Sequence, residues 1–269
     1  MPERVLGPLA LPSVLAYSNR DRARETMKRA IPRRRGRLTL VRTKDDVLAA
    51  LHTTLVDAVI VDLGQASEDT WAVATIAREF PSIPFLGFTA LRPAELSSLA
   101  RACLLEFADC LAEGVEDEVI RELVLPQSFT VRFATALQGA EQTLGLTTPI
   151  QLEAWRRIVA QGGRPVRTEA IADSVGLTRE HLSRRFSADG APNLKRVIDL
   201  VRLMAAAELA KNPGYDLPDI ARVLEFASAS HLSATCQRLF GVKSSSLARL
   251  RPVDLMERFV KQGRGRSRG

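Results

Sequence analysis

Short apolar runs alternate with amphipathic segments over the first half of the chain. The runs are rich in Val, Leu, Ile and Phe, and the segments between them repeat an apolar residue every three or four positions. The runs predict strands and the segments predict helices. The expected strands are 14–18, 38–42, 58–63, 83–90 and 108–112. The expected helices are 20–30, 44–54, 69–80, 94–106 and 116–124.

This alternation indicates a fold class. Strands that alternate with helices build a parallel sheet with right-handed crossovers and helices on both faces. We therefore expect a doubly wound, five-stranded α/β domain over residues 1–124. Ligands of such sheets bind beyond the carboxyl ends of the strands.

The pattern changes after residue 124. Residues 125–148 predict a linker that leads into a helix of about four turns, ending near Gly145. That helix either pairs with its copy in a dimer or is a packed connector. Residues 149–253 predict an all-α domain, in which Thr168 and Asp216 are expected helix caps. Residues 254–269 read as a basic Gly/Arg tail, which we expect to be disordered.

One pattern occurs twice in the all-α part. The stretch IADSVGLTREHLSRRF begins at Ile171, and IARVLEFASASHLSATC begins at Ile220. Each predicts a short helix, a tight turn and a second helix, and Gly176 suits the first turn. Residues 194–210 predict a long helix between the copies. Two such units can reach neighbouring major grooves on one face of DNA.

The second helix of each copy supplies candidate DNA contacts. In the first copy, Leu182 and Phe186 hold one face to the core, so the opposite face is free. Arg184 suits a guanine edge, and Arg179 and Arg185 suit phosphates. The second copy carries less positive charge, and we expect it to add less affinity. The expected contact residues are Arg179, Glu180, His181, Arg184, Arg185, Ser228, Ser230, His231 and Gln237.

Charge is divided unevenly along the chain. The total is +7, of which residues 151–269 hold 21 Lys and Arg against 12 Asp and Glu, a net of +9. Residues 1–150 hold a net of −2. A basic half suggests that one domain meets a polyanion. The basic run 23–37 has two open interpretations, a solvated face or a second contact with DNA or an acidic partner.

Residues 149–251 resemble the DNA-binding domain of the AraC family of bacterial transcription regulators. The matching positions are Ala172, Gly176-Leu177, Leu182-Ser183-Arg184, Phe186, Gly190, Arg202, Ile220-Ala221, Phe226, Ser230 and Phe240-Gly241-Val242. The resemblance implies double-stranded DNA as a partner. We also expect a homodimer, and the resemblance allows RNA polymerase as a further partner. Glu225 replaces the glycine of the second turn, at a cost on the order of 1 kcal/mol. Ala234 and Ser244 depart from the basic residue and the proline of the family.

The first half resembles the receiver domain of response regulators over roughly residues 12–124. Asp62 matches the phosphorylated aspartate and Thr89 the switch threonine. Ser18 and Asn19 stand where the family has its magnesium-binding acidic pair, and Glu113 stands where it has lysine. Because magnesium needs carboxylates and the phosphoryl group needs the lysine, we expect Asp62 to remain unmodified. The resemblance then implies a dimerisation or partner-docking module.

We therefore expect a sequence-specific transcription regulator. One alternative is a phosphorylation-controlled response regulator that uses Asp62, and another is a non-specific architectural DNA-binding protein. No nucleophile elbow, P-loop, dinucleotide fingerprint or metal spacing supports an enzyme or a cofactor. Three scattered cysteines, and the lack of a secretion signal or a membrane-spanning run, favour the cytoplasm and argue against a membrane partner.

Overall fold

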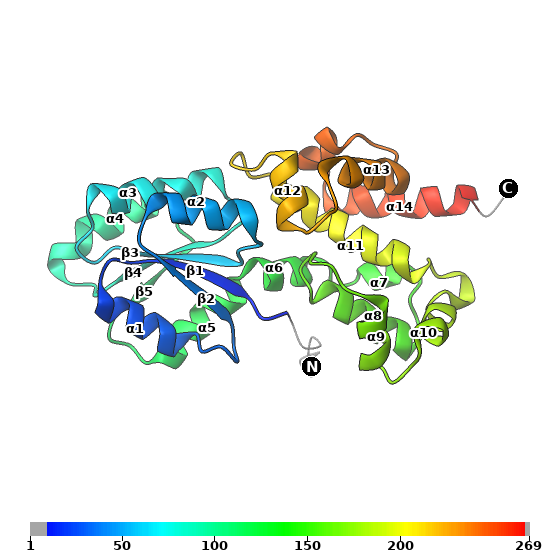
Figure 1. The fold of residues 1–269 in the computed structure, drawn as a ribbon, viewed down its shortest axis with the longest axis horizontal. Coiled ribbons are helices and arrows are strands. Elements are labelled where there is room, and N and C mark those ends of the chain that lie inside the picture. Colours follow the sequence, from blue (N-terminus) through cyan, green and yellow to red (C-terminus); the bar gives the residue numbers. More distant parts are fainter. Residues whose placement is uncertain (1–9, 267–269) are drawn as a thin grey trace. The chain divides into compact units, whose positions relative to one another are not determined.

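The computed structural model describes residues 10–266, so the first nine and last three residues lie outside the description. The chain divides into two compact units (Figure 1). The receiver-like unit comprises Leu11–Arg132 together with Asn212–Tyr215. The helical unit is built mainly from residues 133–211 and 216–266.

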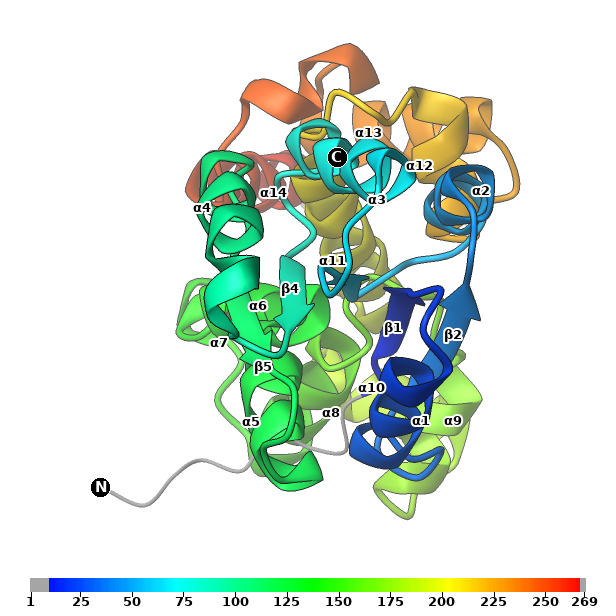
Figure 2. The same cartoon turned by 90° about the vertical axis from the view of Figure 1, so that its left-hand side faces the viewer.

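The receiver-like unit has a five-stranded sheet, as predicted. Every strand pair is parallel, and the order across the sheet is β2-β1-β3-β4-β5. Figure 2 shows β1 and β2 side by side at one edge. The strands are β1 (Ser13–Tyr17), β2 (Arg37–Val41), β3 (Ala58–Asp62), β4 (Phe85–Thr89) and β5 (Asp109–Ala112). Each lies within two residues of its predicted position.

Helices cover both faces of this sheet (Figure 1). Its helices are α1 (Asp21–Ala30), α2 (Lys44–Thr53), α3 (Glu68–Thr75), α4 (Leu96–Leu104) and α5 (Asp117–Gln127). α1 and α5 pack together on one face, and α2 to α4 lie on the other. The central strands β3 and β4 are buried along their whole length because both of their faces are covered. Their carboxyl ends place Asp62 and Thr89 at the same edge of the sheet.

The helical unit is organised around one long helix. α11 (Leu194–Leu209) contacts α8, α12, α13 and α14, and most of its residues are buried. At Gly163, an added Cβ would lie 2.2 Å from the Cβ of Ala205 on α11, so only glycine permits that approach. The other helices are α7 (Ala140–Thr143), α8 (Pro149–Val159), α9 (Thr168–Ser174), α10 (Arg179–Phe186), α12 (Leu217–Val223), α13 (Ala229–Phe240) and α14 (Pro252–Arg266).

The predicted linker helix is wrong in its bounds. α5 continues through Pro126 to Gln127, and α6 (Phe129–Ala136) follows directly. Gly139, at φ 87°, then separates α6 from the single turn of α7. Residues 125–148 are therefore not one segment, because the boundary between the two units falls inside α6.

Two further expectations need correction. The disordered tail is wrong for residues 254–266, which belong to α14, while residues 267–269 lie outside the description. The apolar side chains of Leu255, Met256 and Phe259 are buried and explain that helix. Thr168 is the first residue of α9 and not its cap. Asp216 does cap α12, since its carboxylate accepts a bond from the backbone N–H of Asp219 at 2.7 Å.

Candidate functional site

The two repeated segments fold into matching helix-turn-helix units. In the first, α9 ends at a turn where the N–H of Leu177 donates to the carbonyl of Ala172 at 3.0 Å. In the second, the N–H of Phe226 donates to the carbonyl of Ala221 at 2.7 Å. Equivalent residues thus close both corners, which is the geometry that the sequence repeat predicts.

In the first unit, α10 carries the predicted DNA contacts. We call this helix, and α13 in the second unit, the reading helices. Thr178 caps it, because its hydroxyl accepts a bond from the N–H of His181 at 3.3 Å. Leu182 and Phe186 are fully buried and hold the helix against α8 and α9. The face away from this core is basic. Arg179, Glu180, Arg184 and Arg185 are exposed and His181 is half-buried.

Within α10, the arginines differ in their partners. Arg179 forms an exposed ion pair with Glu169 of α9 at 3.1 Å. An exposed pair of this kind is worth about 0–1 kcal/mol, so a phosphate can replace Glu169. Arg184 lies closer to the middle of the helix, on the face opposite Leu182 and Phe186. One arginine therefore lies within the helix, opposite its buried face, and one lies at the helix start.

The second unit has a strained corner. Glu225 adopts φ 53°, whereas the equivalent Gly176 has φ 67°, so a side chain sits where glycine is favoured. Arg202 of α11 supports this corner: its guanidinium donates to the carbonyls of Leu224 at 2.8 Å and Glu225 at 3.1 Å. It also lies 4.0 Å above the ring of Phe226. Burial lowers the pKa of Arg202, but a guanidinium remains charged at neutral pH.

The second reading helix, α13, is less basic. Ser228 caps it by accepting a bond from the N–H of His231 at 3.0 Å. Ser228, Ser230, His231 and Gln237 are all exposed. Arg238 pairs with Asp199 of α11 at 2.9 Å, which neutralises the one arginine on this helix.

The receiver-like unit contains an acidic site at the carboxyl end of β3. Asp62 is buried, and both of its carboxylate oxygens are occupied by donors. The hydroxyl of Ser18 donates at 2.6 Å, and the N–H of Gly64 donates at 3.0 Å. The guanidinium of Arg20 adds bonds at 2.5 to 3.2 Å.

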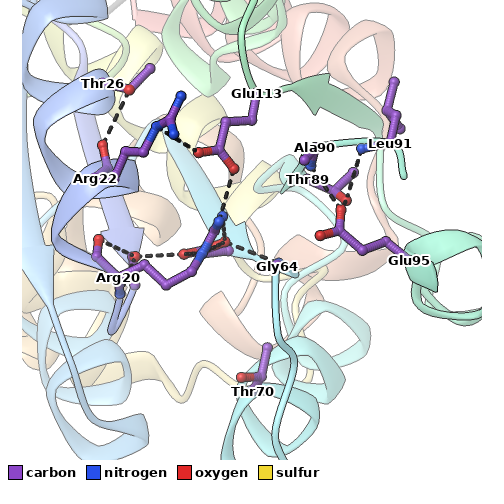
Figure 3. Close-up of polar contacts among 12 residues, drawn as sticks. Arg20, Arg22, Thr26, Gly64, Thr70, Thr89, Ala90, Leu91, Glu95 and Glu113 are labelled. Carbon is purple, nitrogen blue, oxygen red and sulfur yellow. Dashed lines mark hydrogen bonds and ion pairs between the residues drawn. The ribbon is translucent and has the colours of Figure 1, made fainter. Parts of the chain in front are cut away.

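Arg20 also joins Asp62 to the second carboxylate of the site. Its Nη1 lies 2.8 Å from Glu113, which Arg22 approaches at 3.6 Å from the outside (Figure 3). An added Cβ at Gly64 would lie 2.4 Å from the Arg20 guanidinium, so glycine there makes room for the cation. The hydrogen bonds to Asp62, and then those to Glu113, raise the pKa of Arg20 despite its partial burial.

These residues do not fit a magnesium ion. The two acidic ligands of a receiver are replaced by Ser18 and Asn19, and the Arg20 guanidinium occupies the oxygens of Asp62 that a cation would need. Asp21 and Asp109 do not compensate, because Asp21 pairs with Arg42 and Asp109 accepts a bond from Gln127. More generally, no group of three or more His, Cys, Asp or Glu side chains within the described residues could hold a metal ion.

Thr89 is also turned to another partner. Its hydroxyl donates to the carboxylate of Glu95, which the N–H of Ala90 contacts at 2.9 Å (Figure 3). The matching hydroxyl of a working receiver is the one that responds to the phosphoryl group. Here the Thr89 hydroxyl donates to Glu95 and so points away from Arg20 and Asp62.

Comparison with protein families matches residues 171–249 to a model described as "Helix-turn-helix domain". This range contains both helix-turn-helix units and the α11 connection between them. Residues 171–249 form a helix-turn-helix domain of the AraC type. No curated protein matches the chain.

Solved structures with a similar arrangement are response regulators. A response regulator from Thermotoga maritima is 16% identical, with a TM-score of 0.39, over 44% of this chain and 98% of its own. Full-length FixJ from B. japonicum is 12% identical, with a TM-score of 0.39, over 84% of this chain and 96% of its own. The receiver-like assignment itself depends on the strand order and parallel connections described above.

The AraC-type domain keeps the predicted contact residues on two reading helices. The proposed reader Arg184 and the proposed phosphate contacts Arg179 and Arg185 share α10. In the second copy, Ser230, His231 and Gln237 lie on α13, and Ser228 is its N-cap. The pattern did not indicate Arg20, whose partners lie 42 and 93 positions away. The available signal is its place in the short loop after β1, three residues beyond Tyr17 and at the sheet edge that also carries Asp62.

Proposed function

We propose that this protein is a transcription regulator that reads a specific DNA sequence chiefly through α10. A receiver-like unit joined to an AraC-type helix-turn-helix domain is the composition of a DNA-binding transcription regulator. The observation that supports sequence reading is the exposed Arg184 on a helix whose opposite face is fixed by Leu182 and Phe186. A rigid helix with a free guanidinium can form a bidentate contact to guanine.

The second half-site adds less to this reading. α13 offers hydroxyl, imidazole and amide groups, and its Arg238 is paired within the domain. We propose that it contributes orientation and modest base preference. The scattered cysteines and the DNA partner favour a cytoplasmic regulator. A homodimer is a separate part of this proposal and comes from the family resemblance alone.

Selection of bound duplexes from a random DNA pool tests sequence reading. We expect a conserved site whose affinity exceeds that of random DNA by about 10³-fold or more at near-physiological salt. The same measurement over a salt series separates the phosphate contribution from base reading. Equal affinity for selected and random duplexes would support an architectural protein instead.

We further propose that the receiver-like unit acts without phosphorylation. Arg20 supplies an internal cation where a receiver uses magnesium and lysine, and it bonds the oxygens of Asp62 that would attack a phosphodonor. Removing Arg20 would leave the carboxylates of Asp62 and Glu113 without the cation that they share. Breaking a buried ion pair from one side costs about 3–5 kcal/mol.

Paired variants test this assignment. Arg20→Ala should lower the unfolding free energy by about 3 kcal/mol, the low end of that range because part of the side chain meets water. Arg22→Ala is the matched control, since Arg22 is 83% exposed and only approaches Glu113. It should change stability by less than about 1 kcal/mol. Denaturant unfolding measures both.

A direct test uses a small phosphodonor with magnesium. The unmodified mass of the full chain should persist. Phosphate found at Asp62 in the wild-type chain would contradict the proposal and favour the phosphorylation-controlled alternative.

A further inference from the structure

The helical unit contains a cavity of about 600 Å³ beside α8. The apolar part of its lining, called the floor below, includes Leu137, Leu146, Trp155 and Val159. The polar part of its lining, called the rim below, includes Gln138, Glu141, Gln142 and Arg156. Concave sites of 300–1,000 Å³ with an apolar floor and few polar groups are typical of small-molecule binding.

The low exposure of the apolar lining argues for a small occupant. The four apolar floor residues are only 3–4% exposed, although the cavity beside them holds about 600 Å³. A flat protein surface covers only side chains that are open to solvent, so it would contact little of this floor. A small molecule can enter and cover it.

The chemistry of the rim indicates what such a molecule carries. Glu153 pairs with both Arg156 at 3.0 Å and Arg157 at 2.8 Å, and Glu141 brings a second negative charge, so the four charges sum to zero. The rim therefore offers amide donors and acceptors without excess positive charge. An uncharged aromatic molecule with one hydrogen-bonding group fits the Trp155 floor and this rim better than an anion does.

The cavity wall is connected to the reading helix by one buried side chain. Gln151 of α8 is fully buried, and its carbonyl oxygen accepts bonds from the N–H groups of Thr147 and Thr148 at 3.0 and 2.9 Å. These residues directly follow Leu146 in the cavity wall. The amide nitrogen of Gln151 donates to the carbonyl of Phe186, the last residue of α10, at 2.9 Å.

We propose that this cavity is an effector site for a small uncharged aromatic molecule and that its occupant changes DNA reading by α10. An occupant pressing on Leu146 or on α8 would move the partners of Gln151 and thereby the end of α10. The effect on DNA rests on the proposed function. The binding site itself does not.

Fluorescence can detect the occupant without DNA. The chain has two tryptophans, so Trp71→Phe leaves Trp155 in the cavity floor as the sole tryptophan. The probe is N-phenyl-1-naphthylamine, an uncharged aromatic amine that accepts energy from tryptophan. Titration into the full-length Trp71→Phe chain should show saturable energy transfer with one site per chain.

A matched pair of variants locates the binding. Ala134→Phe, in the Trp71→Phe chain, fills the cavity and should weaken binding at least about tenfold, a difference of 1.4 kcal/mol. Ala136→Phe makes the same change on α6 at an exposed position outside the cavity lining, and should bind as the parent does. Circular dichroism confirms that both variants fold. If Ala134→Phe does not fold, anilinonaphthalene sulfonate replaces it as the test, since its added negative charge should weaken binding by a similar factor.

The outcomes separate the site from the function. No saturable transfer, or equal binding by Ala134→Phe and Ala136→Phe, would overturn the site. A change of oligomeric state in Ala134→Phe alone would assign the cavity to a contact between copies and would also overturn it. Probe binding that leaves affinity for the selected duplex unchanged would overturn the coupling. Probe binding in a chain that selects no DNA sequence would retain the site while rejecting the proposed function.

Discussion

At the scale of single residues, we expect two arginines of α10 to make different DNA contacts, Arg184 to a base and Arg179 to a phosphate. Arg184 lies within the helix and opposite its buried face, whereas Arg179 starts the helix and is paired with Glu169. A base contact depends on a fixed direction, which the buried Leu182 and Phe186 provide. A phosphate contact needs only a charge near the DNA backbone.

Arg184→Ala should therefore lose about 1–3 kcal/mol at one base pair of the selected site and relax preference there. Arg179→Ala should weaken all duplexes similarly and reduce the slope of log affinity against log salt by about one. Binding to a set of single-base variants of the site measures both effects. A uniform loss in Arg184→Ala would remove this residue from base reading.

Residue types predicted the reading helices better than the acidic site. Apolar spacing identifies which face of α10 is buried, and the opposite face follows from that alone. Arg20 obeys no local pattern, because its contacts depend on how the sheet brings the ends of β1, β3 and β5 to one edge. The sequence therefore shows that the lysine and the acidic pair of a receiver site are missing, but it does not predict which cation replaces them.

At the scale of elements, the second helix-turn-helix keeps its shape through a contact made from outside it. Glu225 occupies a left-handed conformation that costs a non-glycine residue about 1–2 kcal/mol. The Arg202 guanidinium bonds two carbonyls of this corner and offsets part of that cost. Arg202, shared with the AraC family pattern, thus supports the structure of this corner.

Glu225→Gly should raise stability, because it removes the steric cost at φ 53°. Glycine also gains freedom in the unfolded chain, so we expect a net gain of about 0.5–1 kcal/mol. Ala227→Gly serves as the control: it has no positive φ to relieve and should lose stability. Thermal unfolding of the two variants compares them. A loss of stability in Glu225→Gly would show that the corner is not strained.

Element positions were predictable where local pattern and packing agree. The five strands follow from their apolar runs, since both faces of the central strands are buried. The sequence predicts a linker from residue 125 because Pro126 favours the end of a helix. In the structure, Pro126 lies in the last turn of α5. The sequence does not predict α14, because its Gly and Arg residues are typical of a disordered tail. Its three buried apolar side chains nevertheless hold it as a helix.

At the scale of the whole molecule, two reading helices belong to one rigid domain. α11 is about 24 Å long, from its 16 residues at 1.5 Å each, and it contacts both the α8 side and the α12–α13 side of that domain. Within residues 10–266, none of the helices is both long and apolar enough to cross a membrane. Because α11 contacts both sides of this domain, it fixes the spacing of the two reading helices.

Half-site spacing should be correspondingly strict. Inserting about five base pairs between the two halves of the selected site would turn the second half to the opposite face of the duplex. Affinity should then fall to that of the α10 half-site alone, and the footprint should shrink to one side. Insertion of about ten base pairs should not restore binding fully, because α11 cannot lengthen. Full affinity after the five-base-pair insertion would contradict a rigid spacing.

The burial of α11 on nearly every side has a genetic consequence. Most of its side chains are buried, and α8, α12, α13 and α14 all contact this helix. A truncation such as Leu203→Ala opens a void at a fully buried position of α11, at a cost of about 2–5 kcal/mol. Mutants that recognise only half an operator should therefore map to α10 or α13, and those selected as temperature-sensitive for both halves at once should cluster in this single helix.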